Sequence, residues 1–167
     1  AGNTIKDSVV DTPNDPVGNL YDTTDHKLTL IKTAEGKLYD LLPDATKGIE
    51  KGEVVKGETE VTYVYKERAK GEVVVKYVIE GTSEEIKGAV TDTPSTYLSD
   101  ENGTVATYDT TDQKPSIITK DGKEYQLVEK AVPNEKGNLT EGTTTITYEY
   151  KLVTGTVTVK YEDENGQ

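Results

Sequence analysis

Residues 145–151 read TITYEYK, in which isoleucine and tyrosine alternate with threonine and glutamate. Such alternation places apolar and polar side chains on opposite faces of a β-strand. Isoleucine, tyrosine and threonine are also residue types that strands favour. The stretch therefore predicts a strand with one face on a core and the other face in water.

The same pattern occurs earlier in the chain, because residues 60–66 read EVTYVYK. Apolar residues recur at the equivalent alternate positions, whereas Val64 is replaced by Glu149 on the other face. An apolar face that is kept and an opposite face that varies are typical of a sheet that is buried on one side. We therefore assign both stretches to equivalent strands.

Three further sequence motifs recur in the same order. The motif DTP occurs at 11–13 and 92–94, YDTTD at 21–25 and 108–112, and GEVVVKY at 71–77 with GTVTVKY at 155–161. Only the lengths of the connecting segments differ. The chain therefore contains two copies of one unit, so the fold to be predicted is that of a single repeat.

The repeat allows two divisions of the chain. The first gives two whole modules, 1–81 and 82–167, with a hairpin between 59–66 and 72–79. The alternative places the cuts at 70/71 and 154/155, so that each module begins with the GEVVVKY-type strand. We take the first division as the expectation, because it gives two complete modules.

The remaining segments read mostly as short strands and turns. Asp121-Gly122 is a two-residue hairpin signal, and Glu35-Gly36 stands at the equivalent place in the first copy. Loops are expected at the Gly- and Glu-rich segments 47–57 and 134–142, and single helical turns at most at 23–27 and 110–113. Strands are expected at 5–10, 86–90, 28–33, 37–42, 117–120, 123–128 and 155–161.

Composition excludes several classes of function. Lys and Arg number 19 against 31 Asp and Glu, which gives a net charge of −12. Such a chain is repelled by phosphate backbones and by anionic membranes, so we expect neither partner. The absence of cysteine excludes disulfides, thiolate metal sites and cysteine nucleophiles. With only 32% hydrophobic residues, each unit can bury only a small core.

Catalytic motifs are not found. His26 is the only histidine, and its counterpart in the second copy is Gln113. A catalytic histidine would not be replaced so freely within a duplicated unit, and no Ser-His-Asp set can be assembled in the second copy. We therefore expect a protein that is not an enzyme, has no catalytic residue and needs no cofactor, and we interpret His26 as a surface residue.

The repeated YDTTD motif supplies most of the candidate binding residues. A tyrosine among acids and hydroxyl groups could contact a glycan or a basic protein surface, but the motif could equally close the core and cap a turn. The structural interpretation is the one we favour. The candidates for ligand binding are Tyr21, Asp22, Asp25, Tyr108, Asp109 and Asp112, together with Tyr97, which has no counterpart in the first copy. Asp163 and Asn165 carry the oxygen ligands that calcium prefers and are weaker candidates for a metal site.

The chain resembles two related families of surface repeats. Residues 155–166, GTVTVKYEDENG, resemble the opening of a mucin-binding (MucBP) repeat, and the strands 61–65 and 146–150 resemble its closing. The YDTTD motifs in a double unit of this length resemble the streptococcal surface repeat (SSURE). The resemblance implies a mainly β fold of two tandem β-grasp-like modules, with antiparallel strands and little or no helix. It also implies an extracellular, cell-wall-anchored protein on a bacterial surface, of which this chain is a monomeric internal fragment of a longer array.

Three functions follow from this resemblance. The first is adhesion to a host extracellular-matrix protein, fibronectin before plasminogen, because SSURE repeats occur in adhesins that bind them. The second is binding of mucin or another glycan, as the MucBP resemblance implies. The third is a passive stalk that spaces a distal adhesin from the wall, which divergent surfaces around a constant core would also produce.

Overall fold

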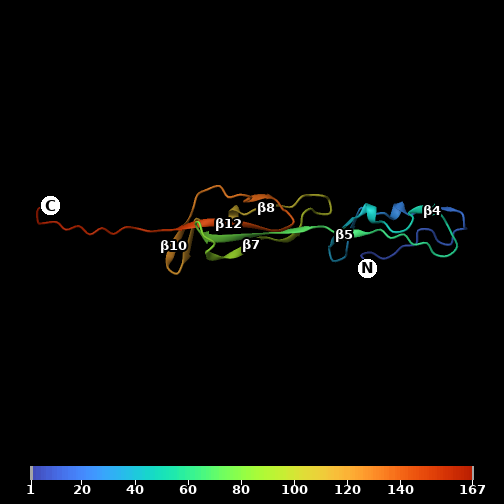
Figure 1. Ribbon diagram of the computed structural model, residues 1–167, viewed down its shortest axis with the longest axis horizontal. Coiled ribbons are helices and arrows are strands. Elements are labelled where there is room, and N and C mark those ends of the chain that lie inside the picture. Colours follow the sequence, from blue (N-terminus) through green and yellow to red (C-terminus); the bar gives the residue numbers. More distant parts are fainter. Residues whose placement is uncertain (1, 167) are drawn as a thin grey trace. The chain divides into compact units, whose positions relative to one another are not determined.

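The computed structural model describes residues 2–166 and shows a mainly β protein (Figure 1). Its contacts divide the chain into two compact units. Unit 1 contains the chain up to Ala69 and the segment Tyr97–Val105, and unit 2 contains Lys70–Thr96 and the chain from Ala106 onward. Within residues 2–166 the helical elements are short 3-10 turns only. No helix in that part of the chain is long and apolar enough to span a bilayer.

Unit 1 is built from short antiparallel pairs of strands. The strands β1 (Leu20–Asp22) and β4 (Lys51–Glu53) form one pair. A three-stranded sheet has the order β2-β3-β5, with β2 at Leu30–Lys32, β3 at Leu38–Leu41 and β5 at Tyr65–Glu67. The hairpin between β2 and β3 turns at Gly36, whose φ of 85° favours glycine. Ile31 and Leu38 form its small core.

Unit 2 contains a five-stranded sheet with the order β7-β6-β12-β10-β9. The strands β6 (Lys70–Ile79) and β12 (Gly142–Leu152) run parallel at its centre, which departs from the expected all-antiparallel arrangement. The other strands are β7 (Glu85–Tyr97), β9 (Ile117–Lys120) and β10 (Lys123–Leu127). A separate pair joins β8 (Thr107–Asp109) to β11 (Lys136–Asn138).

The core of unit 2 lies on one face of β6 and β12. The alternate residues Val73, Val75 and Tyr77 of β6 are 0% exposed, and Tyr148 and Tyr150 of β12 are also 0% exposed. The intervening residues of β12 are half-buried or exposed. The one-sided strand that the alternation of TITYEYK predicted is therefore confirmed.

The two units share their local architecture, so the expectation of tandem, mainly β modules is confirmed. Tyr21 of β1 pairs with Gly52 of β4, and Tyr108 of β8 pairs with Gly137 of β11. Each YDTTD motif passes from its strand into a 3-10 turn, η1 (Thr24–His26) in unit 1 and η3 (Thr111–Gln113) in unit 2. A third turn, η2 (Pro43–Ala45), occurs in unit 1.

Several sequence-based expectations about local structure were wrong. The hairpin between 59–66 and 72–79 is absent from the described chain, because β5 pairs with β3 while β6 pairs with β12. The segments 47–57 and 134–142, expected as loops, contain β4 and β11. Residues 5–10 and 155–161 form no strand. A strand forms only where its main-chain groups find a partner, and alternation in sequence does not provide one.

The division into units differs from the division at 81/82. Lys70–Ile79, which that division assigns to the first module, belongs to unit 2. The boundary after Ala69 lies next to the alternative cut at 70/71. The physical reason is the parallel pairing of β6 with β12, which buries the apolar face of β6 inside unit 2.

Candidate functional site

The YDTTD motif of unit 2 makes hydrogen bonds within the unit itself. Thr110 is 0% exposed; its Oγ1 donates to the main-chain oxygen of Glu135 at 2.7 Å and lies 2.8 Å from the hydroxyl oxygen of Tyr148. Tyr108 Oη donates to the main-chain oxygen of Asn134 at 2.7 Å. The tyrosine and the first threonine of the motif therefore fasten the segment before β11 to the core.

Unit 1 repeats this arrangement. Thr23 Oγ1 donates to the main-chain oxygen of Glu50 at 2.9 Å and lies 2.7 Å from the hydroxyl oxygen of Tyr63. Tyr21 Oη donates to the main-chain oxygen of Ile49 at 2.8 Å. Because equivalent atoms make equivalent bonds in both units, the motif has a structural role in each.

The first aspartate of each motif caps the turn that follows. Asp22 Oδ1 accepts the main-chain N–H and the hydroxyl of Thr24 at 2.9 and 2.6 Å. Asp109 Oδ1 does the same for Thr111 at 2.9 and 2.7 Å. Hydrogen bonds from these threonine hydroxyls and N–H groups lower the pKa of both carboxyl groups from the ordinary value of 3.8. This is the Asx-turn geometry that aspartate favours in turns.

The second aspartate of each motif is placed differently. Asp25 and Asp112 lie within the 3-10 turns and are exposed to solvent. Each unit therefore presents one exposed carboxylate at the same place, beside a capping aspartate that is occupied by its own turn.

A lysine and a glutamate complete the contacts around the buried tyrosine. In unit 2, Lys114 Nζ lies 3.0 Å from Glu135 Oε1 and 5.3 Å from the ring centre of Tyr148. In unit 1, Lys27 and Glu50 take these places at 3.0 Å, and Lys27 Nζ lies 5.8 Å from the ring centre of Tyr63. Burial raises the pKa of the Tyr148 phenol to about 12. The arrangement is a partly buried polar network with a structural function in both units.

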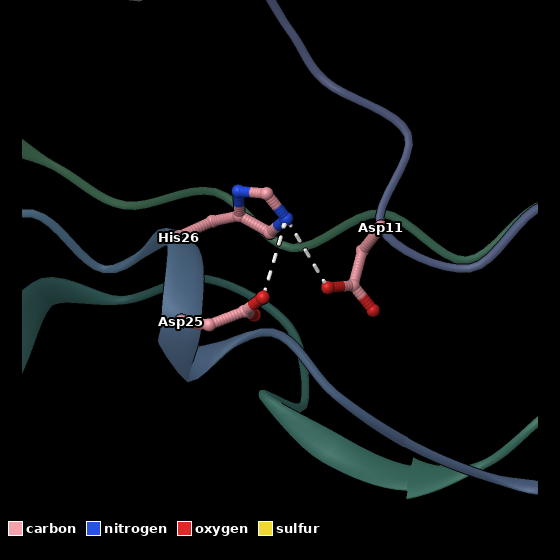
Figure 2. Close-up of side chains that lie close together, drawn as sticks. All are labelled: Asp11, Asp25 and His26. Carbon is pink, nitrogen blue, oxygen red and sulfur yellow. Dashed lines mark ion pairs between the residues drawn. The ribbon is translucent and has the colours of Figure 1, made fainter.

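His26 lies beside two carboxylates in unit 1, as Figure 2 shows. Its Nε2 is 3.4 Å from Asp11 Oδ1 and 3.7 Å from Asp25 Oδ2. Within residues 2–166 this is the one group of three side chains whose ligand atoms are close enough to hold a metal ion. Asp25 and His26 are exposed to solvent, so we interpret the three side chains as a surface contact between charged groups. The sequence placed His26 and Asp25 together but did not predict Asp11 beside them.

Tyr97, the candidate without a counterpart in the first copy, is half-buried within unit 1. Its Oη donates to Glu67 Oε2 at 2.7 Å and accepts the main-chain N–H of Leu38 at 3.2 Å. Burial and the bond to Glu67 raise the pKa of this phenol. These contacts join the segment Tyr97–Val105 to β3 and β5.

The calcium candidates Asp163 and Asn165 lie in an exposed turn. The main-chain N–H of Asn165 donates to Asp163 Oδ1 at 2.9 Å, which is again an Asx turn. Neither residue belongs to the metal-compatible group found within residues 2–166.

Unit 1 contains a large open groove that sequence reasoning missed. Its volume is about 1440 Å³, and the N-terminal segment that includes Ile5 and Asp11 lines it together with residues 57–65. Val61, Tyr63 and Tyr65 are half-buried there, whereas their equivalents in unit 2 are buried. The signal that could have indicated the groove was the GTVTVKY motif, which repeats a strand that has no counterpart among the described residues of unit 1.

The two units thus define a tandem repeat protein of small β modules whose shared polar residues serve their own fold. The MucBP domain model matches residues 1–66 and 72–151. The chain therefore belongs to the MucBP domain family, and the predicted MucBP-like repeat is confirmed.

One curated relative and one solved structure are similar to the chain. The muramidase-released protein of Streptococcus suis is 34% identical over 196 residues, which cover 99% of this chain and 15% of that protein. The solved structure contains Streptococcal High Identity Repeats in Tandem (SHIRT) domains 3-4 from a cell surface protein. It has 10% identity and a TM-score of 0.35, and the match covers 87% of this chain and 84% of that one.

Proposed function

We propose that this chain is a non-catalytic adhesion repeat of a bacterial cell-surface protein, and that it binds a glycoprotein of the host. Membership of both units in the MucBP family is the observation that carries the proposal. The name of the S. suis relative says that muramidase releases it, which suits a protein held in the cell wall. Fibronectin is the first ligand to test and plasminogen the second, because the sequence resembles the SSURE repeats.

The contact that we propose is the acidic turn that each unit displays. Asp25 and Asp112 are exposed at equivalent positions, and the chain carries a net charge of −12. Such a surface favours a basic patch on the partner, and salt weakens contacts of this kind. Two turns at equivalent positions in one chain also provide two contacts, whose combined affinity exceeds that of either alone.

Binding of the whole chain to immobilised fibronectin, plasminogen and mucin tests the proposal. We expect saturable binding to one of them, weakened about tenfold or more between low and high salt. The double variant Asp25→Asn with Asp112→Asn should lose most of this binding. Glu35→Gln with Glu129→Gln removes two exposed acids outside the motif and serves as the control with the same change in charge.

A second candidate function is that of a spacer. It is favoured by the hydrogen bonds of Thr23, Tyr21 and their equivalents, which are directed into each unit. Absence of binding to all three glycoproteins would contradict the adhesion proposal and favour the spacer. Mucin binding that deglycosylation abolishes would instead identify a glycan as the ligand.

A further inference from the structure

The surface contact of His26 with Asp11 and Asp25 also has the spacing of a set of metal ligands (Figure 2). Nε2 of His26 lies 3.4 Å from Asp11 Oδ1 and 3.7 Å from Asp25 Oδ2, and the three atoms all lie within 4.8 Å of one another. Both printed separations exceed the length of an N–H···O hydrogen bond, which is about 2.7–3.2 Å. Ligand atoms bound at about 2.0–2.1 Å to a tetrahedral zinc ion stand about 3.3–3.4 Å apart. The imidazole nitrogen therefore faces two carboxylates at a distance that suits an ion between them.

Neighbouring groups orient the ligand atoms. Thr12 Oγ1 donates to Asp11 Oδ2 at 2.6 Å, and the other oxygen of Asp11 faces His26. Asp25 and His26 are consecutive residues of η1, and Asp22 caps the turn that leads into it. Hydrogen bonds of this kind, made behind the ligand atoms, usually orient the ligands of a metal site.

Unit 2 brings its equivalent aspartates together in the same way. Burial, and then the charges of Asp112 and Asp92, raise the pKa of the Tyr77 phenol, so both carboxylates lie near that hydroxyl. The hydroxyl donates to the main-chain oxygen of Gln113, the residue that follows Asp112. β6, which carries Tyr77, lies between β7 and β12 in the sheet of unit 2. The approach of the two aspartates is therefore a property of the repeat and is independent of the open groove of unit 1.

The units differ in the residue that would bind a metal ion through nitrogen. Unit 1 has His26 at this position, whereas unit 2 has Gln113, and His26 is the only histidine in the chain. A neutral imidazole is a common ligand of zinc and of related transition-metal ions. The repeat therefore provides the two carboxylates in both units and the imidazole in unit 1 alone.

We propose that Asp11, Asp25 and His26 form a binding site for a divalent transition-metal ion, with zinc as the ion to test. One imidazole and two carboxylates supply three ligands, and the exposure of Asp25 and His26 leaves a fourth position open to water. Calcium and magnesium prefer oxygen ligands, so the imidazole selects against them. The site is separate from the calcium candidates Asp163 and Asn165.

A bound ion would tie the segment before β1 to η1. Residues 2–19, which include Asp11, form no strand or helix. The ion would fix this segment to Asp25 and His26, so zinc should stabilise unit 1 and leave unit 2 unchanged. It would also neutralise Asp25, which the adhesion proposal uses. Host binding is therefore measured in EDTA and zinc binding without a host protein, so that the failure of either proposal is separate from the other.

Proton NMR of the tag-free whole chain tests the site directly, because one histidine gives one set of imidazole signals. We expect zinc at an equal concentration to shift or broaden these signals and EDTA to restore them. An excess of calcium should leave them in place. The effect of zinc should weaken in mild acid, because imidazole must lose its proton to bind a metal ion. Imidazole signals that an excess of zinc leaves unchanged would overturn the proposal.

Calorimetric titration with zinc separates the site from general binding to acidic residues. Asp25→Asn should weaken zinc binding at least about tenfold, since even changes beside a metal ligand cost that much. Asp112→Asn removes the same charge from the equivalent turn of unit 2 and should leave zinc binding unchanged. Equal losses from the two variants would show that zinc binds to the acidic surface in general, and would refute the site.

Exchange of the residues that distinguish the units completes the test. His26→Gln should abolish zinc binding, and Gln113→His should add a second site, because unit 2 already brings Asp92 and Asp112 together. Tyr77 bonds to the main chain of Gln113, so this side chain can be replaced without loss of that bond. Melting curves without zinc check that both variants fold. Binding that His26→Gln retains, or that Gln113→His leaves at one ion per chain, would contradict the proposal.

Discussion

The hydroxyl oxygens of Thr110 and Tyr148 lie 2.8 Å apart in the interior of unit 2, where both residues are 0% exposed. The equivalent oxygens of Thr23 and Tyr63 lie 2.7 Å apart in unit 1, where both residues are only half-buried. Equivalent threonine–tyrosine hydrogen bonds therefore occur in both units, fully buried in unit 2 and half-buried in unit 1. Because the cost of breaking a hydrogen bond depends on access to water, the two units should respond differently to the same substitution.

We expect Thr110→Val to lower the free energy of unfolding of unit 2 by about 1–3 kcal/mol. Valine has a similar shape but removes one hydrogen-bond contact from the Tyr148 hydroxyl and one from the Glu135 main-chain oxygen. The first group keeps the Glu135 carboxylate as a partner, and the second keeps the main-chain N–H of residue 110. Thr23→Val should cost less than about 1 kcal/mol, because water can reach the half-buried site. Native-state hydrogen exchange can assign each loss to its unit. Equal costs in both units would contradict the difference in burial.

We expect Gly71→Ala to destabilise unit 2 by about 1–3 kcal/mol, because overpacking a filled position forces the backbone to shift. The added Cβ atom would meet the main-chain oxygen of Thr140 at 2.0 Å. Gly155→Ala is the matched control and should leave the unfolding midpoint of the dilute protein unchanged, because nothing lies within 4 Å. Urea unfolding followed by circular dichroism measures both. A neutral Gly71→Ala would show that β6 and Thr140 are not in close contact.

Arg68 joins the segment Tyr97–Val105 to the rest of unit 1. Its guanidinium donates to both carboxylate oxygens of Asp40, at 3.0 and 2.7 Å, and to the main-chain oxygens of Ser99 and Asp100. Lysine cannot make this forked contact. We expect Arg68→Lys to speed amide hydrogen exchange in residues 98–104 several-fold. It should lower the free energy of unfolding by only about 1 kcal/mol, because Asp40 is partly exposed. Lys66→Arg on the neighbouring exposed position should change neither quantity.

The sequence predicted the strands that carry the alternating motifs, because their alternation is a local property. It also predicted the structural role of Asp22 and Asp109, since an aspartate two residues before a free N–H favours an Asx turn. It failed where a strand needs a distant partner. Ile5 and Val157 occur in stretches that read as strands, but nothing in either stretch reveals whether a partner stands beside it.

The parallel pairing of β6 with β12 could not be read from the sequence for a related reason. The two motifs that compose them follow one another in each repeat as EVTYVYK and then GEVVVKY, and nearby strands favour a hairpin. The structure instead pairs β6, which contains GEVVVKY, with β12, which contains TITYEYK and comes later in the chain. Tyr77 then contacts the rings of Tyr148 and Tyr150, at centre distances of 6.4 and 6.2 Å. Only long-range packing of this kind distinguishes the two arrangements.

We expect stability to fall in acid through the capping aspartates. Hydrogen bonds hold the folded-state pKa of Asp22 and Asp109 below the ordinary value of 3.8. A carboxyl group with a lowered pKa stabilises the fold above its unfolded-state pKa, and this contribution is lost as pH falls through the folded-state pKa. Asp22→Asn with Asp109→Asn keeps the acceptor oxygens but removes the titration. The variant should therefore show a shallower loss of melting temperature below about pH 4, and an unchanged slope would contradict this assignment.

In alkali the buried tyrosines should destabilise the fold. Burial raises the pKa of Tyr148 from 10.0 to about 12 and also raises the pKa values of Tyr77 and Tyr150. A phenol with a raised pKa binds its proton more tightly in the folded state. Its contribution to the stability of the fold is therefore complete below the pKa of the unfolded state and is lost as pH rises through the pKa of the folded state. We therefore expect the melting temperature of unit 2 to fall between about pH 10 and about pH 12.

Tyr150→Phe tests this expectation, because phenylalanine keeps the ring in the core and removes the group that titrates. The variant loses the bond from the Tyr150 hydroxyl to the main-chain oxygen of Pro115, 2.6 Å in length, and should be less stable than the parent at neutral pH. Its melting temperature should nevertheless fall less steeply in alkali. Tyr161→Phe is the control, since Tyr161 is 91% exposed and should change neither quantity in dilute solution. Parallel alkaline curves for Tyr150→Phe and the parent would show that ionisation of this phenol is not what unfolds unit 2.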